Sequence, residues 1–230
     1  MTSAAANARV LVIGAGGLGC PALLALAPRV RTVGIVDDDI VELSNLNRQI
    51  LHRTEDVGRP KVQSARDAVR RRFPSVNVET LRARVDADNV DAAVRGWDVV
   101  VDGTDSFDAK FLINDACVRA GIPLVHGGVV RFTGQLMSVV RGSACYRCLF
   151  EAPPPPGVAP SCQEAGIVGA FAGVIGGLMA DEALAILDGT PRLAGTMLVV
   201  DGLEDRRRRV AVRPRAGCEA CCRSIPREVA

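Results

Sequence analysis

The chain has 230 residues, of which 48% are hydrophobic and 23% charged, and its formal net charge is +2. This composition predicts one large globular domain or one domain with a small appendage. The weak net charge and the aromatic content of only 3% argue against nucleic-acid binding. No basic region followed by an apolar run opens the chain, so we expect no signal peptide and a cytoplasmic location. The most apolar stretch, Ala165 to Ala180, is short for a membrane span and predicts a buried helix.

Apolar runs alternate with amphipathic stretches from the first strand to residue 130. We predict strands at Arg9–Ile13, Val33–Val36, Val99–Val101 and Leu124–Val130. Helices are predicted between them, at Leu18–Leu26, Lys61–Arg72 and Ala109–Ala120. Alternation of this kind is typical of βαβ units, so we expect a Rossmann-like, doubly wound α/β fold with a mainly parallel sheet.

The pattern changes after Gly128. Residues 129–140 have the pattern strand, turn, strand, which predicts an antiparallel extension of the sheet. A proline-rich stretch then predicts a crossover loop over residues 145–165, leading to a helix that begins near Ser161. Late edge strands are expected at Met197–Val200 and Val210–Val212, beside a solvated run of arginines at Arg206–Arg209. We treat residues 1–230 as a single domain with a C-terminal tail at 213–230.

A glycine-rich turn follows the first strand directly. It reads Gly14-Ala15-Gly16-Gly17-Leu18-Gly19 and contains the pattern G-x-G-x-x-G. Glycines let the backbone turn tightly and approach a ligand, and the N-terminus of the following helix favours phosphate. Asp37 ends the second strand, 18 residues after Gly19, where a carboxylate can bind ribose hydroxyls. These two features alone predict a nucleotide site with NAD as the default ligand.

Further charged residues change that interpretation. Arg48 lies in the string SNLNRQ, Lys61 in VGRPK, and Asp105 in DGTD at the end of a central strand. Ligands of open α/β sheets bind at the carboxyl ends of the strands, so these side chains are expected to converge there. A nicotinamide site has no obvious need for them, whereas a triphosphate with Mg²⁺ needs cations for its phosphates and a carboxylate for its metal.

The string GAGGLG…DDDIVELSNLNRQ…VGRPK…DGTDS resembles the MoeB/ThiF family, the bacterial relatives of the ubiquitin-activating enzymes, from about Arg9 to Cys222. The resemblance implies a single adenylation domain. It implies that ATP adenylates the C-terminal glycine carboxylate of a ubiquitin-like or sulfur-carrier protein that ends in Gly-Gly. Pyrophosphate would leave, and sulfur transfer or conjugation would follow. The resemblance also implies a homodimer and allows a sulfur donor as a further partner.

The same resemblance assigns roles to single residues. Asp37 matches the ribose-binding aspartate, Lys61 matches the family's lysine, and Asp105 matches the aspartate near Mg²⁺. Asn45 and Arg48 match its phosphate contacts, and Gly17 matches the glycine under the nucleotide. The nucleotide-binding set is therefore predicted to be Gly14, Gly16, Gly17, Asp37, Asn45, Arg48, Lys61 and Asp105, with Arg48, Lys61 and Asp105 also catalytic.

Eight cysteines are present, and four of them form two Cys-x-x-Cys pairs. In a chain without an expected leader this pattern favours metal binding over disulfides. We predict a tetrahedral Zn²⁺ site that would clamp the C-terminal tail to the sheet, as in the resembled family. The predicted ligands are Cys145, Cys148, Cys218 and Cys221. Cys222 directly follows Cys221 and could compete as the fourth ligand.

Cys162 lies between the proline-rich loop and a predicted helix. A helix N-terminus lowers the pKa of a thiol, so Cys162 is a candidate for covalent attachment of the carrier, as in ThiF-like members. The alternative is a partly buried small residue without a role, as in MoeB-like members. Cys20 and Cys117, together with His52 and His126, are expected to be structural.

One feature departs from the resembled family. Its members usually begin with a helix whose arginine reaches the partner subunit's ATP, and none of the eight residues before the first strand matches that helix. Another arginine would substitute, ATP would bind more weakly, or the dimer would be arranged differently. The missing arginine leaves open a non-catalytic module that binds a carrier protein. An NAD-dependent oxidoreductase, based only on the glycine turn and Asp37, is the other alternative.

Overall fold

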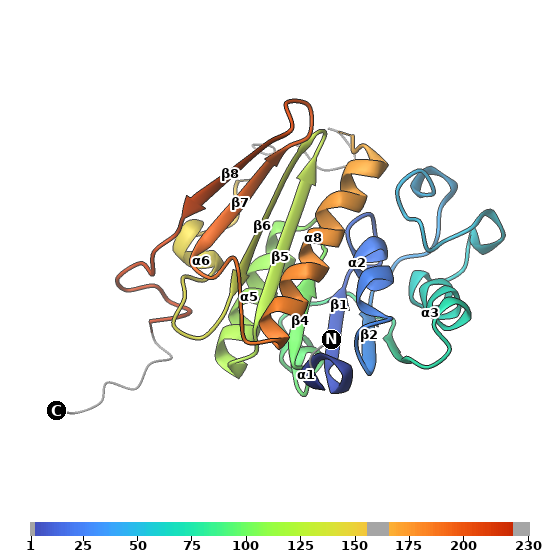
Figure 1. Ribbon diagram of the computed structural model, residues 1–230, viewed down its shortest axis with the longest axis horizontal. Helices are drawn as coiled ribbons and strands as arrows, with labels where there is room; N and C mark the ends of the chain where they lie inside the picture. The colour runs from blue at the N-terminus through green and yellow to red at the C-terminus, as the bar shows by residue number, and fades with distance from the viewer. Residues whose placement is uncertain (1–2, 156–165, 223–230) are drawn as a thin grey trace.

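A computed structural model describes residues 3–155 and 166–222 of the chain (Figure 1). Its centre is one eight-stranded sheet with the strand order β3-β2-β1-β4-β5-β6-β7-β8. The strands are β1 Arg9–Ile13, β2 Thr32–Val36, β3 Asn77–Leu81, β4 Val99–Asp102, β5 Leu124–Val130, β6 Thr133–Val139, β7 Thr196–Asp201 and β8 Arg206–Ala211. The described α-helices are α1 Ser3–Asn7, α2 Gly19–Leu26, α3 Lys61–Arg72, α4 Val90–Val94, α5 Phe107–Ala120, α6 Tyr146–Leu149 and α8 Gly169–Leu187.

The sheet has a parallel half and an antiparallel half. Strands β3, β2, β1, β4 and β5 pair in parallel, whereas β5 to β8 pair antiparallel. Helices α2, α3 and α8 cover one face, and α4 and α5 cover the other (Figure 1). Residues of β1 alternate between these two layers, since Val10 and Val12 pack on the α2 and α8 side and Leu11 and Ile13 on the α5 side. The predicted doubly wound fold with an antiparallel extension is confirmed.

Strand β3 and helix α4 have no counterpart in the sequence prediction. Strand β3 reads NVETL, and of its residues only Val78 is buried. It lies at the edge of the sheet, so it needs neither a continuous apolar run nor regular alternation. Helix α4 is only five residues long. Both elements therefore lack the periodicity on which the prediction depended.

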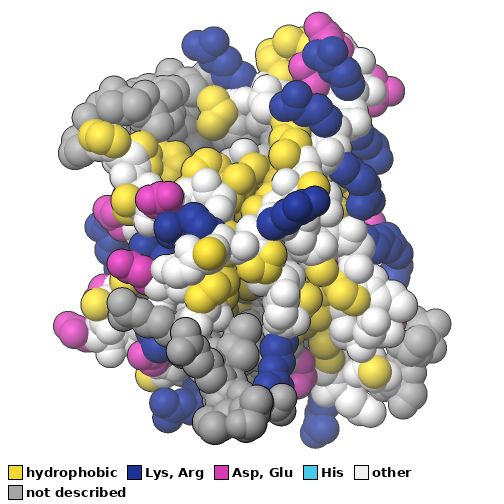
Figure 2. Space-filling model, turned by 90° about the vertical axis from the view of Figure 1, so that its left-hand side faces the viewer, with side chains coloured by type: hydrophobic (Ala, Val, Ile, Leu, Met, Phe, Trp, Pro, Cys, Tyr) yellow, Lys and Arg dark blue, Asp and Glu magenta, His cyan; other side chains and the backbone are white. Residues whose placement is uncertain are grey.

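The arginine run is itself part of a strand, rather than lying beside one as predicted. β8 contains Arg206 to Arg209, all exposed, and pairs along its whole length with β7. β7 is consequently an interior strand, which corrects its prediction as an edge. Long arginine side chains can reach water from either face of an edge strand, and their charge protects its open side from pairing with another chain. Figure 2 views this side of the molecule, where basic side chains are spread among hydrophobic ones.

Helix α8 is the one helix in the described ranges that is long and apolar enough to cross a membrane by length and composition. About half of this apolar stretch is buried, because α8 packs against α2 and against β4, β5 and β6. The predicted buried helix is thus present from Gly169. Its predicted start near Ser161 lies outside the described residues.

One buried carboxylate attaches α8 to the antiparallel half of the sheet. Glu182 is 3% exposed, and its carboxylate accepts hydrogen bonds from the Ser138 hydroxyl at 2.7 Å and the Leu193 amide at 2.9 Å. The Arg192 amide donates to it as well, at 3.0 and 3.2 Å. Glu182 therefore joins α8, β6 and the segment that precedes β7.

We predict that Glu182→Ala lowers the free energy of unfolding by about 3 kcal/mol, because it leaves the buried Leu193 amide and Ser138 hydroxyl, and the part-buried Arg192 amide, without their acceptor. Urea denaturation monitored by circular dichroism measures this change. The neighbouring Asp181 is exposed on the same helix, so Asp181→Ala is the matched control and is expected to change stability by at most about 0.5 kcal/mol. Equal stability of the two variants would contradict the assigned role.

Candidate functional site

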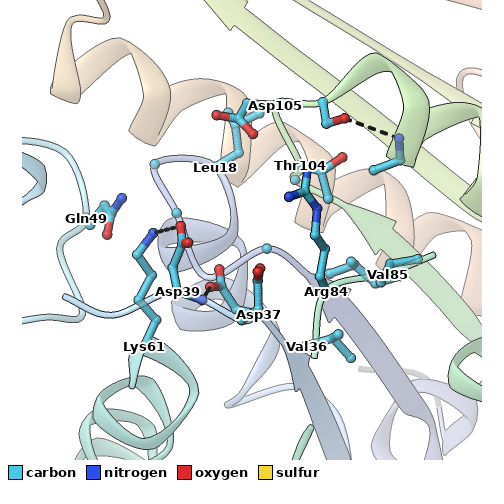
Figure 3. Close-up of a pocket in the computed structure, with 18 of the residues that line it drawn as sticks. Leu18, Val36, Asp37, Asp39, Gln49, Lys61, Arg84, Val85, Thr104 and Asp105 are labelled. Atoms are coloured by element: carbon cyan, nitrogen blue, oxygen red, sulfur yellow. Dashed lines mark hydrogen bonds and ion pairs between the residues drawn. The ribbon is translucent and has the colours of Figure 1, made fainter. Parts of the chain in front are cut away.

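A cavity of about 380 Å³ lies at the carboxyl ends of the parallel strands (Figure 3). Its volume is in the range of roughly 300–1,000 Å³ that is usual for small-molecule sites. It opens where the strand order reverses between β1 and β4, which is the position at which open α/β sheets bind ligands. All eight residues of the predicted nucleotide-binding set line it: Gly14, Gly16, Gly17, Asp37, Asn45, Arg48, Lys61 and Asp105.

Two of the loop glycines are required by the backbone itself. Gly14 has a φ of +93°, a conformation that side chains with a Cβ rarely adopt. A Cβ on Gly19 would collide with the carbonyl oxygen of Gly14. Gly17 is different, since a Cβ there would meet the Arg48 side chain only at an ordinary 3.5 Å. Packing within the chain therefore does not require Gly17, and its missing side chain widens the cavity next to the N-terminus of α2, where phosphate is favoured.

Asp37 fixes the shape of this loop from the end of β2. Its carboxylate accepts hydrogen bonds from the backbone amides of Ala15 at 2.7 Å and Asp39 at 2.9 Å. Burial raises the pKa of Asp37 above its ordinary value, although the nearby Lys61 acts in the opposite direction. Beneath the loop, the imidazole of the buried His52 lies 3.0 Å from the carbonyl oxygen of Ala15. His52 therefore supports the loop and has the structural role expected for it.

The two predicted phosphate-binding cations come from segments that follow β2. Lys61 begins α3, is nearly buried, and forms an ion pair of 2.8 Å with Asp39. Arg48 donates hydrogen bonds to the Ser44 carbonyl at 3.2 Å and to the Asn45 side-chain oxygen at 3.1 Å. Asn45 thus orients Arg48 at the cavity wall. A direct contact between Asn45 and phosphate stays a prediction.

The loop that carries Asp105 is held by the carboxylate of Asp102, a residue that sequence reasoning missed. Asp102 is fully buried and accepts hydrogen bonds from the Thr104 amide at 2.9 Å and the Thr104 hydroxyl at 2.6 Å. Lys110 of α5 lies 3.2 Å from its other oxygen, and His126 of β5 lies 2.7 Å from it. A charged residue at the end of the apolar run VVV was the available signal for Asp102.

The charges of this network determine its protonation. Burial opposes ionisation of Asp102, but Lys110 and the hydrogen bond from His126 outweigh it and hold the pKa of Asp102 well below its ordinary value. Burial lowers the pKa of His126, although Asp102 acts in the opposite direction. The network is therefore a carboxylate paired with an ammonium and a neutral imidazole. Asp105 itself is exposed at the cavity, and a carboxylate oxygen is the kind of ligand that Mg²⁺ prefers.

The four cysteines of the two Cys-x-x-Cys pairs meet in a second cluster. Their sulfur atoms all lie within 4.8 Å of one another, with 3.6 Å between Cys145 and Cys218 and 3.4 Å between Cys148 and Cys221. Cys222 lies outside the cluster, since it is exposed and its thiol donates to the Arg215 carbonyl. A compact set of four sulfurs fits tetrahedral Zn²⁺. The geometry favours Cys221 over Cys222 as the fourth ligand.

The remaining cysteines fall into two groups. Cys20 and Cys117 are fully buried, and burial raises the pKa of Cys20 to about 12. Burial also raises the pKa of Cys117, so both are core residues as expected. Cys162 lies outside the described residues. Its catalytic role stays a prediction from the sequence.

The chain is similar to known proteins over most of its length. The family model described as ThiF family matches residues 2–220. A Haloferax volcanii protein named SAMP-activating enzyme E1 is 45% identical over 217 residues, which cover 94% of this chain and 80% of that protein. A Thermus thermophilus sulfur carrier protein adenylyltransferase is 46% identical over 223 residues, which cover 94% of this chain and 82% of that protein.

Other relatives are longer. A Mycobacterium tuberculosis protein named probable adenylyltransferase/sulfurtransferase MoeZ is 45% identical over 215 residues, which cover 90% of this chain but 55% of that protein. The solved structure of E. coli MccB with ATP has the same fold, with a TM-score of 0.84 at 21% identity over 95% of this chain and 68% of that chain. From the family match and from relatives at this level of identity, the chain belongs to the ThiF family.

Proposed function

We propose that the chain uses ATP to adenylate the C-terminal carboxylate of a ubiquitin-like or sulfur-carrier protein. The observation that carries the proposal is the convergence of the glycine loop, Asp37, Arg48, Lys61 and Asp105 on one cavity. The names of the relatives, an E1 for SAMP and an adenylyltransferase for a sulfur carrier protein, support the same reaction.

The reaction is a substitution at phosphorus. An oxygen of the carrier's carboxylate forms a bond to the α-phosphorus of ATP, and the bond from that phosphorus to the bridging oxygen breaks, so pyrophosphate leaves. Asp37 would bind the ribose, and the glycine loop would receive the phosphates at the N-terminus of α2. Arg48 and Lys61 would stabilise the charge that develops on the phosphate oxygens. Mg²⁺, held by Asp105, would neutralise phosphate charge when bound.

The alternatives are less well supported. An NAD-dependent oxidoreductase would use the glycine loop and Asp37, but would leave Arg48, Lys61 and Asp105 in the cavity without a use. A non-catalytic module that binds a carrier would need neither cations nor a metal-binding carboxylate at a nucleotide site. The homodimer, the Gly-Gly ending of the carrier, the sulfur donor and the cytoplasmic location stay predictions from the sequence.

We predict that Lys61→Ala and Asp105→Ala each reduce carrier-dependent exchange of pyrophosphate into ATP by about a hundredfold or more, because each removes one charge that stabilises the transition state. Radiolabelled pyrophosphate measures the exchange, and circular dichroism verifies the fold. Arg53 is exposed and lies outside the cavity lining, so Arg53→Ala is expected to retain full exchange. Wild-type rates in both Lys61→Ala and Asp105→Ala would refute the proposed site.

The cysteine cluster is proposed to bind one structural Zn²⁺ per chain. We expect reduced, freshly purified protein to contain one equivalent of zinc and Cys148→Ser or Cys221→Ser to lose it, with a lower melting temperature, because binding of the metal is coupled to folding. Cys222→Ser is the matched control and is expected to retain the metal. Elemental analysis by mass spectrometry decides the question, and zinc loss in Cys222→Ser but not in Cys221→Ser would show that the fourth ligand is misassigned.

Cys162 is proposed from the sequence alone to displace AMP from the adenylated carrier. As a thiolate it would form a thioester with the carrier; once a persulfide sulfur donor has transferred its outer sulfur atom to it, the Cys162 persulfide would displace AMP and form an acyl disulfide. Adenylation itself needs no thiol, so Cys162→Ser is expected to retain pyrophosphate exchange and lose a reductant-sensitive adduct with the carrier. Mass spectrometry of enzyme, carrier, ATP and sulfur donor looks for that adduct. If the wild-type enzyme forms no such adduct and Cys162→Ser still supports full sulfur transfer, the residue has a structural role.

A further inference from the structure

The segment that follows β3 brings one arginine to the cavity. Residues 83–86 all line it, and the Asn89 side chain fixes their backbone. Its amide nitrogen donates to the Arg84 carbonyl at 2.8 Å, and its amide oxygen accepts from the Asp86 backbone at 3.2 Å. Val85 is buried in the core beside α4. The backbone at Arg84 is therefore held from two sides, while the Arg84 side chain is exposed at the cavity.

Arg84 lies on the other side of Asp37 from Lys61 in the cavity (Figure 3). In Figure 3, Lys61 and Gln49 lie on one side of Asp37 and Asp39, whereas Arg84, Val85 and Thr104 lie on the other. With phosphates at the glycine loop, Arg48 and Lys61, and with the ribose at Asp37, the nucleobase is directed toward Arg84. The wall at this end includes the apolar side chains of Val36 and Val85.

The guanidinium of Arg84 differs from the other cationic groups of the cavity. Lys61 is paired with Asp39, and Arg48 is held by three oxygen atoms. Within residues 3–155 and 166–222, no hydrogen bond or ion pair engages the Arg84 guanidinium. A planar cation that is not engaged in pairing and stands beside an apolar wall is suited to stacking on an aromatic ring. Arginine planes bind unstacked bases of nucleic acids in the same way.

We propose that Arg84 stacks on the nucleobase of bound ATP and contributes base affinity rather than phosphate affinity. The proposal rests on the proposed function, because it takes the cavity to be the ATP site. Arg84 is thereby a specificity-determining residue that acts at the end of the nucleotide remote from the reacting phosphorus. A purine presents a larger aromatic face to the guanidinium than a pyrimidine does, so this contact favours ATP over pyrimidine nucleotides.

Isothermal titration calorimetry with ATP and with AMP tests the proposal through binding alone. Arg84→Ala is expected to weaken both ligands by the same factor, roughly three- to tenfold, because both carry the base. Arg84→Lys retains the charge without the planar face and is expected to stay closer to Arg84→Ala than to wild type. Arg82 is exposed, two residues away and outside the cavity lining, so Arg82→Ala is the matched control with unchanged affinities.

Three results would overturn the proposal. Wild-type affinities in Arg84→Ala would show that the residue makes no contact. A loss that is larger for ATP than for AMP and is restored by Arg84→Lys would show that it binds phosphate by charge. If wild-type protein binds neither nucleotide, the ATP site itself is wrong. Binding of ATP by wild type together with an unaffected Arg84→Ala refutes only the role of Arg84, so the two failures are distinguishable.

Discussion

The buried charge of Asp102 is the constraint on which the cavity depends. Removing one partner of a buried ion pair typically costs about 3–5 kcal/mol, so the groups around the carboxylate must stay in place. Lys110 comes from α5, His126 from β5 and Thr104 from the loop after β4. Lys110 also donates to the Gly127 carbonyl at 2.7 Å. One carboxylate thus fixes two strands, a helix and the loop that presents Asp105.

The parallel and antiparallel halves of the sheet contribute differently to the structure around Asp102. The parallel half ends its strands at the cavity and supplies the glycine loop, Asp37 and the segment after β3. The antiparallel half extends the sheet from β5, and Glu182 and the cysteine cluster attach α8 and the tail to it. Polar side chains in the interior therefore lie at the junctions between elements, where each joins parts of the chain that are distant in sequence.

Local chemistry decides which parts of this arrangement were predictable from the sequence. The strands β1, β2, β4 and β5 are apolar runs, so they were predicted. The glycine turn was predicted as well, because the backbone at Gly14 adopts a conformation that favours glycine. Strand β3 is a polar edge strand and was not predicted. The segment that follows it was therefore not expected at the cavity, and Arg84 was missed as a lining residue. Asp102 and Asp105 share one motif, but only tertiary structure separates the buried residue from the exposed one. The two Cys-x-x-Cys spacings, by contrast, were sufficient to predict that these four cysteines form one cluster.

The position of α8 in the chain has a consequence for synthesis on the ribosome. β4, β5 and β6 are complete at residue 139, but the helix that covers one face of these strands ends only at Leu187. While the intervening residues are being made, apolar side chains such as Val101, Val125 and Leu136 lack their cover from α8. Transiently exposed apolar surface makes a nascent chain prone to aggregation. The emerging protein is therefore expected to require chaperone protection during translation of this interval, before the last cysteine pair has left the exit tunnel.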